Sequence, residues 1–227
     1  MTVEDAVPGA AGFLPHRMDL SELSRAALRC HGCELWRRGT QTVFGAGAPD
    51  AAAMLVGEQP GDQEDRQGQP FVGPAGHLLE RAVERAGLDR ASIYLTNAVK
   101  HFKWEPRGKR RLHKAPSRVE IAACHPWLLA EISAVRPKVI VCLGATAARS
   151  VLGREVRVLR ERGEIVPWAP PAPGAGVAQL DAEGAVEAKA MVTVHPSSIL
   201  RAQDDAREVE MDAFVHDLAR IRPLVTG

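Results

Sequence analysis

Short apolar runs recur along this chain, and a segment with helical spacing separates each run from the next. The runs span residues 52–56, 93–99, 139–143 and 190–194, while the principal helical segments span 20–28, 74–86, 117–132 and 206–221. Continuous apolar runs of this length are typical of strands buried on both faces, and strands that alternate with helices pair in parallel. We therefore expect an α/β fold: a three-layer α/β/α sandwich with a central four-stranded, mainly parallel sheet.

The chain length and composition favour one domain. With 227 residues, 45% of them hydrophobic, the chain can bury a sizeable core. Residues 1–18 are rich in Gly, Pro and Ala and predict a loose amino-terminal arm, followed by a single domain over 19–227. A second stretch of this composition, residues 169–187, is expected to be a surface excursion. A monomer is the expected state.

Charge and hydropathy exclude several classes of protein. The net charge is only +1, so any affinity for nucleic acid must come from local patches. The start has no basic region before an apolar run, and no segment approaches the roughly 20 apolar residues of a membrane span. We expect a cytoplasmic, nucleoid-associated protein without a membrane partner. In that reducing compartment, four cysteines favour metal ligation or burial over disulfides.

Polar segments follow three of the predicted strands. Residues 57–61 (GEQPG) follow the first strand, Asn97 lies at the end of the second, and residues 195–198 (HPSS) follow the fourth. In open parallel sheets, ligands bind outside the carboxyl ends of the strands. We therefore expect these three segments to form one site.

A basic segment lies between the second strand and the next helix. Residues 101–114 carry six cations and one acid, Glu105, without apolar periodicity, and they predict a long exposed loop. Such a loop suits the tracking of phosphates, although a solvated loop without a fixed partner has the same composition. Within it, Trp104 either stacks on DNA or anchors the loop to the core.

The segments GEQPGDQED, LTNAVK and HPSSIL together resemble motifs of the iron-sulfur uracil-DNA glycosylases of the family 4 type, and the resemblance extends from about Cys30 to Leu200. The run KRRLH, at residues 109–113, is similar to the basic loop of the UdgX subgroup. Members of that subgroup become covalently attached to uracil-containing DNA through the histidine of this loop. Leu112 stands where Ile is expected, and the charged residues and the histidine are retained.

The resemblance implies that Cys30, Cys33, Cys124 and Cys142 hold a [4Fe-4S] cluster. Zinc is the chemical alternative, because four thiolates also suit a tetrahedral structural site. Taken alone, Cys142 in the apolar run VIVCLGA is better explained as a buried core residue. The cluster is expected to attach the amino-terminal region to the core, since hydrolysis of a glycosidic bond transfers no electrons.

The resemblance also implies roles for individual residues. Phe71 would stack on an extruded uracil, and the Asn97 amide would read N3–H and O4 together, a pattern that cytosine reverses. His195 would stabilise negative charge at O2 of the departing base. Gln59 and Asp62 are expected near this pocket. DNA contacts are expected from four further residues: Lys109, Arg110, Arg111 and Ser197. The alternatives are that the two arginines hold the loop closed and that Ser197 caps the following turn.

The remaining catalytic residues are His113 and Glu58. A neutral His113 imidazole held on its loop would capture the sugar C1′ before water does, with Glu58 binding the other ring N–H. The resulting hypothesis is a glycosylase that excises uracil from DNA, single-stranded DNA included, and stays attached to the abasic site. The alternatives are a family 4-type glycosylase with multiple turnovers and a noncatalytic, metal-stabilised nucleic-acid-binding protein.

Overall fold

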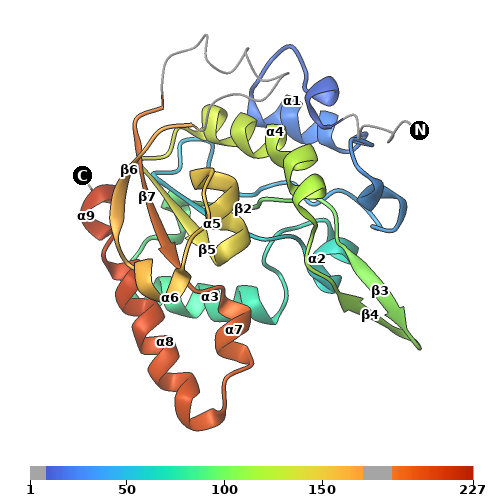
Figure 1. The fold of residues 1–227 in the computed structure, drawn as a ribbon. Helices are drawn as coiled ribbons and strands as arrows, with labels where there is room; N and C mark the ends of the chain where they lie inside the picture. The colour runs from blue at the N-terminus through green and yellow to red at the C-terminus, as the bar shows by residue number, and fades with distance from the viewer. Residues whose placement is uncertain (1–8, 171–185, 227) are drawn as a thin grey trace.

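The computed structural model describes residues 9–170 and 186–226, and its centre is a five-stranded sheet (Figure 1). The strand order is β2-β1-β5-β7-β6, and all pairs are parallel except β6 with β7. The bounds are β1 Ala53–Gly57, β2 Ile93–Asn97, β5 Val139–Leu143, β6 Ile165–Trp168 and β7 Ala188–Thr193. The predicted α/β class and mainly parallel sheet are confirmed, and all four predicted strands are present.

The prediction of four strands missed the edge strand β6. This strand has only four residues, and one of them is Pro167, which lacks the N–H of a ladder donor. Proline is tolerated on an edge strand, because one side of such a strand has no partner. The short run and its proline gave no sequence signal for a strand.

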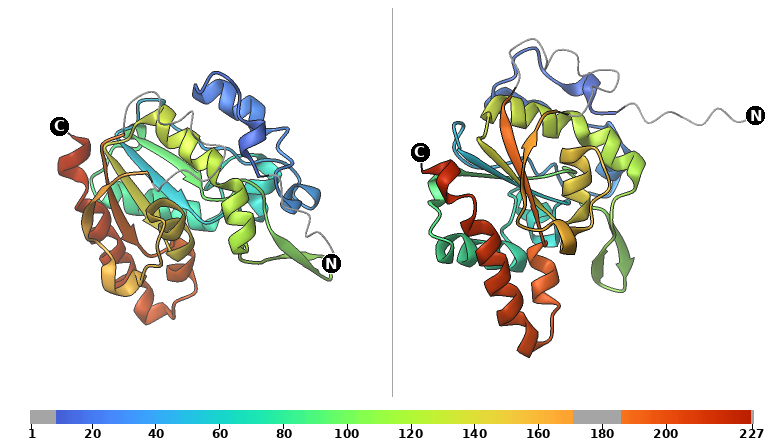
Figure 2. Two further views of the ribbon diagram at one scale, coloured as in Figure 1. Left: turned by 45° about the horizontal axis from the view of Figure 1, so that its top comes forward. Right: turned by 60° about the vertical axis from the view of Figure 1, so that its left-hand side comes forward.

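Helices cover both faces of the sheet (Figures 1 and 2). Alternate residues of each strand point to opposite faces, so that Leu55 packs with α3, α7 and α8 while Met54 packs with α4 and α5. Helix α1 packs on the outer side of α4, in a further cluster around the fully buried Trp127. The bounds are α1 Leu20–Ala27, α2 Asp62–Gln67, α3 Pro74–Arg85, α4 Arg118–Val135, α5 Ala145–Leu152, α6 Val158–Glu161, α7 Pro196–Leu200, α8 Asp204–Ala219 and α9 Arg222–Val225.

Local capping sets where the helices begin. The Asp19 side chain accepts a hydrogen bond from the Glu22 N–H at the start of α1. Ser117 and Glu120 form the reciprocal capping box predicted for α4. Three short 3₁₀ turns complete the described helical elements: η1 Ala11–Phe13, η2 Glu34–Arg37 and η3 Arg90–Ser92.

The amino-terminal region is attached to the core where the structure describes it. Ala10 is buried, its N–H donates to the Ala123 carbonyl, and the Gly9 N–H donates to the Gly32 carbonyl. Residues 9–18 of the expected loose arm therefore pack against α4 and the loop around Gly32. Residues 1–8 of that arm and residues 171–185 of the expected surface excursion lie outside the described residues.

The basic segment expected as a long loop is a β-hairpin that projects from the body (Figure 1). Strands β3 (Trp104–Arg107) and β4 (Arg110–His113) pair antiparallel, with Trp104 opposite His113. A two-residue turn joins them, in which Gly108 has a φ of +59°. The hairpin has mostly charged and few apolar side chains, so the apolar pattern of the sequence did not indicate its two strands. No helix in the described ranges is long and apolar enough to cross a membrane.

Candidate active site

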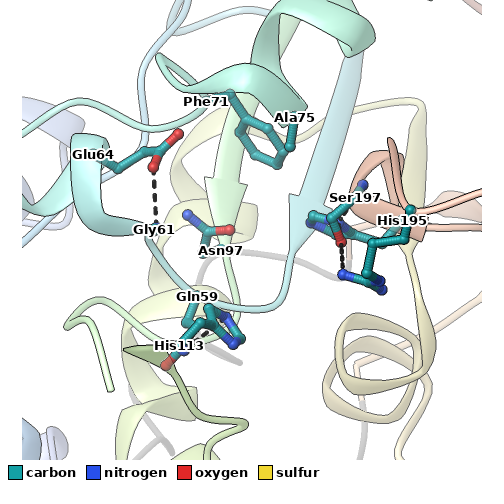
Figure 3. A pocket seen from close by; sticks show the side chains of 10 residues that line it. Gln59, Gly61, Glu64, Phe71, Ala75, Asn97, His113, His195 and Ser197 are labelled. Atoms are coloured by element: carbon teal, nitrogen blue, oxygen red, sulfur yellow. Dashed lines mark hydrogen bonds between the residues drawn. The ribbon is translucent and has the colours of Figure 1, made fainter. Parts of the chain in front are cut away.

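The three strand-end segments and the hairpin surround one cavity of about 390 Å³ (Figure 3). Its position at the carboxyl edge of the parallel strands agrees with the sequence expectation. Phe71, Asn97, His113 and His195 all line it, although they come from four separate segments. The other lining residues are Gln59, Gly61, Glu64, Ala75, Ser197 and Arg201.

Phe71 is held in an uncommon backbone conformation. Its φ is +58°, which is rare for a residue with a large side chain, and its side chain is only 8% exposed. Gly76 permits this arrangement, because a Cβ at that position would collide with the Phe71 carbonyl. The Glu64 carboxylate accepts hydrogen bonds from the N–H groups of Gly61 and Gly73, and so fixes both ends of the segment that carries Phe71.

Asn97 lies at the end of β2, opposite Gly57 of β1 in the parallel register. A Cβ at Gly57 would collide with Asn97 Oδ1 and lie 2.8 Å from Phe71 Cζ, so the glycine makes room for both side chains. Asn97 is 3% exposed, and within the described residues its carboxamide has no hydrogen-bond partner in the protein. The amide is therefore available to a planar polar ligand in the cavity.

His195 is neutral and donates from a defined nitrogen. The Ser197 backbone N–H donates to His195 Nδ1 at 3.1 Å, so Nδ1 is the acceptor and Nε2 carries the proton. Burial lowers the pKa of His195 to about 4, with smaller contributions from His113 and Arg201. The residue thus presents an uncharged N–H donor at the cavity wall.

His113 is the last residue of β4 and lies at the base of the hairpin, next to the cavity. Burial lowers the pKa of His113 below its usual value; Glu58 opposes this shift and Arg201 adds to it. His113 Nε2 lies 2.9 Å from Gln59 Nε2 and 3.6 Å from Glu58 Oε1. The imidazole is therefore neutral near pH 7, as nucleophilic attack requires.

Gln59 joins both ends of the hairpin to the loop after β1. Its Oε1 accepts from the Lys103 N–H at 3.0 Å, which fixes the orientation of the amide, and its Nε2 donates to the Lys114 carbonyl at 2.9 Å. Lys103 and Lys114 directly flank the two strands of the hairpin. Gln59 thus lines the pocket, as expected, and also holds the hairpin that carries His113.

Glu58 borders a second cavity of about 310 Å³, which shares its wall of His113 and His195 with the first. Thr146 at the start of α5 donates to Glu58 Oε2 at 2.5 Å. The other Glu58 oxygen faces His113 at a distance beyond a hydrogen bond. Its assignment to the second imidazole N–H stays a prediction.

Arg111 fixes the hairpin to α2. Its guanidinium donates to Asp62 and, at 2.6 Å, to the buried Asp65, and it lies over the rings of Phe102 and Trp104. Arg111 therefore clamps the hairpin to α2, and its expected contact with DNA stays a prediction. Asp62 correspondingly faces Arg111 and is not among the residues that line the cavity.

The remaining residues of the predicted DNA-contacting set differ in their surroundings. Lys109 lies in the exposed hairpin turn and Arg110 is exposed beside it. Ser197 lies within hydrogen-bond distance of His195 Nδ1 and lines both cavities. Trp104 donates its indole N–H to the Arg38 carbonyl, which favours its anchoring role.

The four cysteines do not form one group. Cys30, Cys33 and Cys124 belong to the core cluster between α1 and α4, while Cys142 points from β5 into the cluster beneath α5. Burial raises the pKa of the Cys33 thiol and that of Cys124 to about 12. Among the described residues, no set of three or more His, Cys, Asp or Glu side chains is arranged to hold a metal. Cys142 thus lies in a different core cluster from the other three thiols, and the four-thiolate site stays a prediction.

Sequence patterns missed two features near the cavity. Lys100 and Glu131 form a buried ion pair directly behind Asn97. Arg201, on the residue after α7, borders both cavities and approaches both histidines closely enough to lower their pKa values. Lys100 directly follows the predicted strand 93–99. Nothing in the sequence shows that its side chain turns into the core toward Thr96.

Comparison with known proteins agrees with the geometry. The model of the Uracil DNA glycosylase superfamily matches residues 44–219. A type-4 uracil-DNA glycosylase of Pyrobaculum aerophilum is 32% identical over 184 residues, covering 81% of this chain and 86% of the relative. The type-4 uracil-DNA glycosylase of Thermotoga maritima is 38% identical over 154 residues, covering 67% and 77%. A type-5 uracil-DNA glycosylase of P. aerophilum is 31% identical over 134 residues, covering 52% and 56%.

Proposed function

Because the chain belongs to the uracil-DNA glycosylase superfamily, we propose that it excises uracil from DNA and that His113 then bonds covalently to the exposed sugar carbon, as in the UdgX subgroup. The observation that carries the proposal is the shared cavity: a neutral His113 lines the same space as Phe71, Asn97 and His195. The type-4 relatives support base removal, and the hairpin histidine supports capture of the sugar.

Base removal depends on the edge of the sheet. The extruded uracil stacks on Phe71, and the Asn97 carboxamide accepts from N3–H and donates to O4. When the C1′–N1 bond breaks, its electron pair leaves with the base and negative charge spreads to O2. The N–H at Nε2 of neutral His195 donates a hydrogen bond to O2 and stabilises that charge without giving up its proton.

Capture depends on the hairpin. The electron-deficient C1′ accepts the lone pair of one His113 nitrogen, and a nitrogen–carbon bond forms. The proton on the other nitrogen of the resulting imidazolium then passes to the Glu58 carboxylate or to water. Glu58, 3.6 Å from the ring, is the nearest carboxylate to neutralise that charge. Since the product bond is stable, each protein molecule reacts once.

A second candidate is a conventional glycosylase with multiple turnovers. It is favoured by Glu58, whose carboxylate borders the second cavity and could direct a water molecule to C1′. In this alternative the hairpin binds phosphates through Lys109 and Arg110, and His113 only closes the cavity. Both candidates require the same pocket for uracil.

We also propose a metal site at Cys30, Cys33 and Cys124, which share one core cluster and interact electrostatically, although their thiols are not arranged around a metal in the described residues. An iron-sulfur cluster there would tie the segment that follows α1 to α4, and zinc is the alternative. Thiols must lose their protons to bind metal, so the high pKa values of Cys33 and Cys124 describe protonated thiols that a bound cation would deprotonate. The structure assigns no fourth ligand.

The test is incubation with a single-stranded oligonucleotide that contains one uracil. The proposal predicts a protein–DNA conjugate that survives denaturation, in a yield that matches the uracil released. His113→Ser should abolish the conjugate and permit turnover by water, whereas the control His77→Ser, at an exposed position of α3, should change neither. Free abasic product from substoichiometric wild-type protein would favour the conventional glycosylase, and an unchanged conjugate in His113→Ser would exclude this nucleophile.

A further inference from the structure

A fully buried ion pair lies directly behind the residue proposed to read the base. Lys100 and Glu131 are 1% and 0% exposed in their side chains, and Lys100 Nζ donates to a Glu131 carboxylate oxygen. The same ammonium donates to Thr96 Oγ1 and to the main-chain carbonyl of Asn97, each at 2.7 Å. Its three protons therefore have three acceptors, two of which belong to the last two residues of β2.

The second oxygen of the Glu131 carboxylate is equally occupied. It accepts from the Gly45 N–H at 2.9 Å and from the Tyr94 hydroxyl at 3.0 Å, while Thr96 Oγ1 lies within 3.0 Å of both oxygens. The pair thus links β2, α4 and the segment around Gly45 in one satisfied network. Buried charges are expensive to desolvate, and an apolar pair of similar volume often gives equal stability. A role beyond stability is therefore a reasonable hypothesis for this pair.

The network determines where the Asn97 amide points. No described residue hydrogen-bonds the carboxamide itself, so its direction follows from the main chain at the end of β2 and from its packing against Gly57. We propose that Lys100 and Glu131 are positioning residues for Asn97, an inference that rests on the proposed function. They hold its carbonyl so that the amide meets the base edge without first rearranging.

A similar buried network lies at the end of β7, the strand that precedes His195, and it supplies a matched control. Thr193, two residues before His195, donates to the buried Asp217 of α8 at 2.6 Å, and Arg162 donates to the same oxygen at 2.7 Å. Asp217 lies on the opposite face of the sheet from Glu131, and it supports the strand that leads to His195. A variant at Asp217 should therefore perturb stability and the end of β7 without acting through Asn97.

The test is a double-mutant cycle under single-turnover conditions, with protein in excess over a uracil-containing oligonucleotide. Lys100→Met removes the ammonium, and Thr96→Val removes one hydroxyl of the network without removing a charge. Each is made with Asn97 and with Asn97→Ala, and both the rate of uracil release and the reacting fraction are recorded. Asp217→Asn is carried through the same cycle.

Because a displacement of about 1 Å can slow an enzymatic step about 100-fold, we expect Lys100→Met to slow uracil release by about 10- to 100-fold. Thr96→Val should slow it by about 5-fold, as suits the loss of one uncharged hydrogen bond. Both effects should shrink below 2-fold in the Asn97→Ala background, because positioning matters only when the amide is present. Asp217→Asn should have the same effect in both backgrounds.

Equal slowing by Lys100→Met and Thr96→Val with and without Asn97 would overturn the inference and leave the proposed function intact. The same holds if both variants lower only the reacting fraction at an unchanged rate, which is the signature of lost folding alone. If Asn97→Ala by itself leaves uracil release unchanged, the assignment of base reading fails, and the inference fails with it.

Discussion

Replacing Arg111 by Met should separate base removal from capture of the sugar. The Arg111 side chain is 14% exposed; it joins the hairpin to α2 through Asp62 and Asp65 and also donates to the Thr40 hydroxyl. Apart from this clamp and the contacts of Gln59 and Trp104, the hairpin is largely exposed. A two-stranded hairpin alone is marginally stable in water, so its docked position depends on these contacts.

The magnitude follows mainly from Asp65. Asp62 is 41% exposed and contributes little as an ion-pair partner, whereas the Asp65 side chain is fully buried. Loss of one partner from a buried pair costs about 3–5 kcal/mol. Asp65 keeps two hydrogen bonds from Thr40, so we take the lower end, about 3 kcal/mol. At about 1.4 kcal/mol for each factor of ten, docking of the hairpin weakens by up to about 100-fold.

The assay follows uracil release and denaturation-resistant conjugate in the same samples. Arg111→Met should lower the conjugate formed per uracil released by up to about 100-fold, with uracil release within a few-fold of wild type. The control is Arg110→Met, a neighbouring exposed cation outside the clamp, which should retain the wild-type ratio. If Arg111→Met forms conjugate at the wild-type ratio, docking of the hairpin by this clamp does not govern capture.

Three further results are expected. Burial lowers the pKa of His113 below its ordinary value of 6.5, so the imidazole stays neutral as the pH falls to that value. The rate of conjugate formation should therefore stay level down to pH 6.5 and decline only below it. A decline centred above pH 6.5 would contradict the assignment of His113 as nucleophile. Elemental analysis of the purified protein should find iron or zinc, which Cys124→Ser should lose and Cys142→Ser should keep, whereas equal loss from both would support the four-cysteine site. Gly57→Ala places a methyl group against Asn97, so uracil release should fall by about 100-fold while binding of uracil-free DNA stays within 2-fold, and wild-type release would show that the cavity tolerates the added carbon.

The sequence predicted those parts of the fold that depend on apolar periodicity. Val139–Leu143 was predicted with its observed bounds, because every one of its residues is buried and apolar. Ser117 predicted the start of α4, because a capping box has a short local signature. The hairpin and β6 were missed for the opposite reason: their pairing depends on neighbours distant in sequence, and their own residues are charged, exposed or, at Pro167, unable to donate.

The site divides in the same way. Asn97 and His195 could be placed together, since strand ends of a parallel sheet meet at one edge. Phe71, which lies between α2 and α3, was assigned to the pocket only through the family resemblance. The position of Cys142 could not be predicted, because a strand residue faces one side or the other according to register, and its spacing from Cys124 carries no such information. Lys100 was missed because lysine is almost never fully buried without a partner, and that partner, Glu131, lies 31 residues away.

The residues proposed for recognition and for capture lie on supports that differ in burial. Asn97 ends β2 and His195 lies two residues after β7, and buried networks around Glu131 and Asp217 hold these strand ends. His113 instead lies on an exposed hairpin that polar contacts hold in place. If the proposed function is correct, changes in those polar contacts shift the outcome between a trapped conjugate and turnover, whereas changes at the sheet edge stop both, because capture needs the cationic sugar that base removal creates. Under the proposed function, the nucleophile can therefore change in evolution without a change in the base that is recognised.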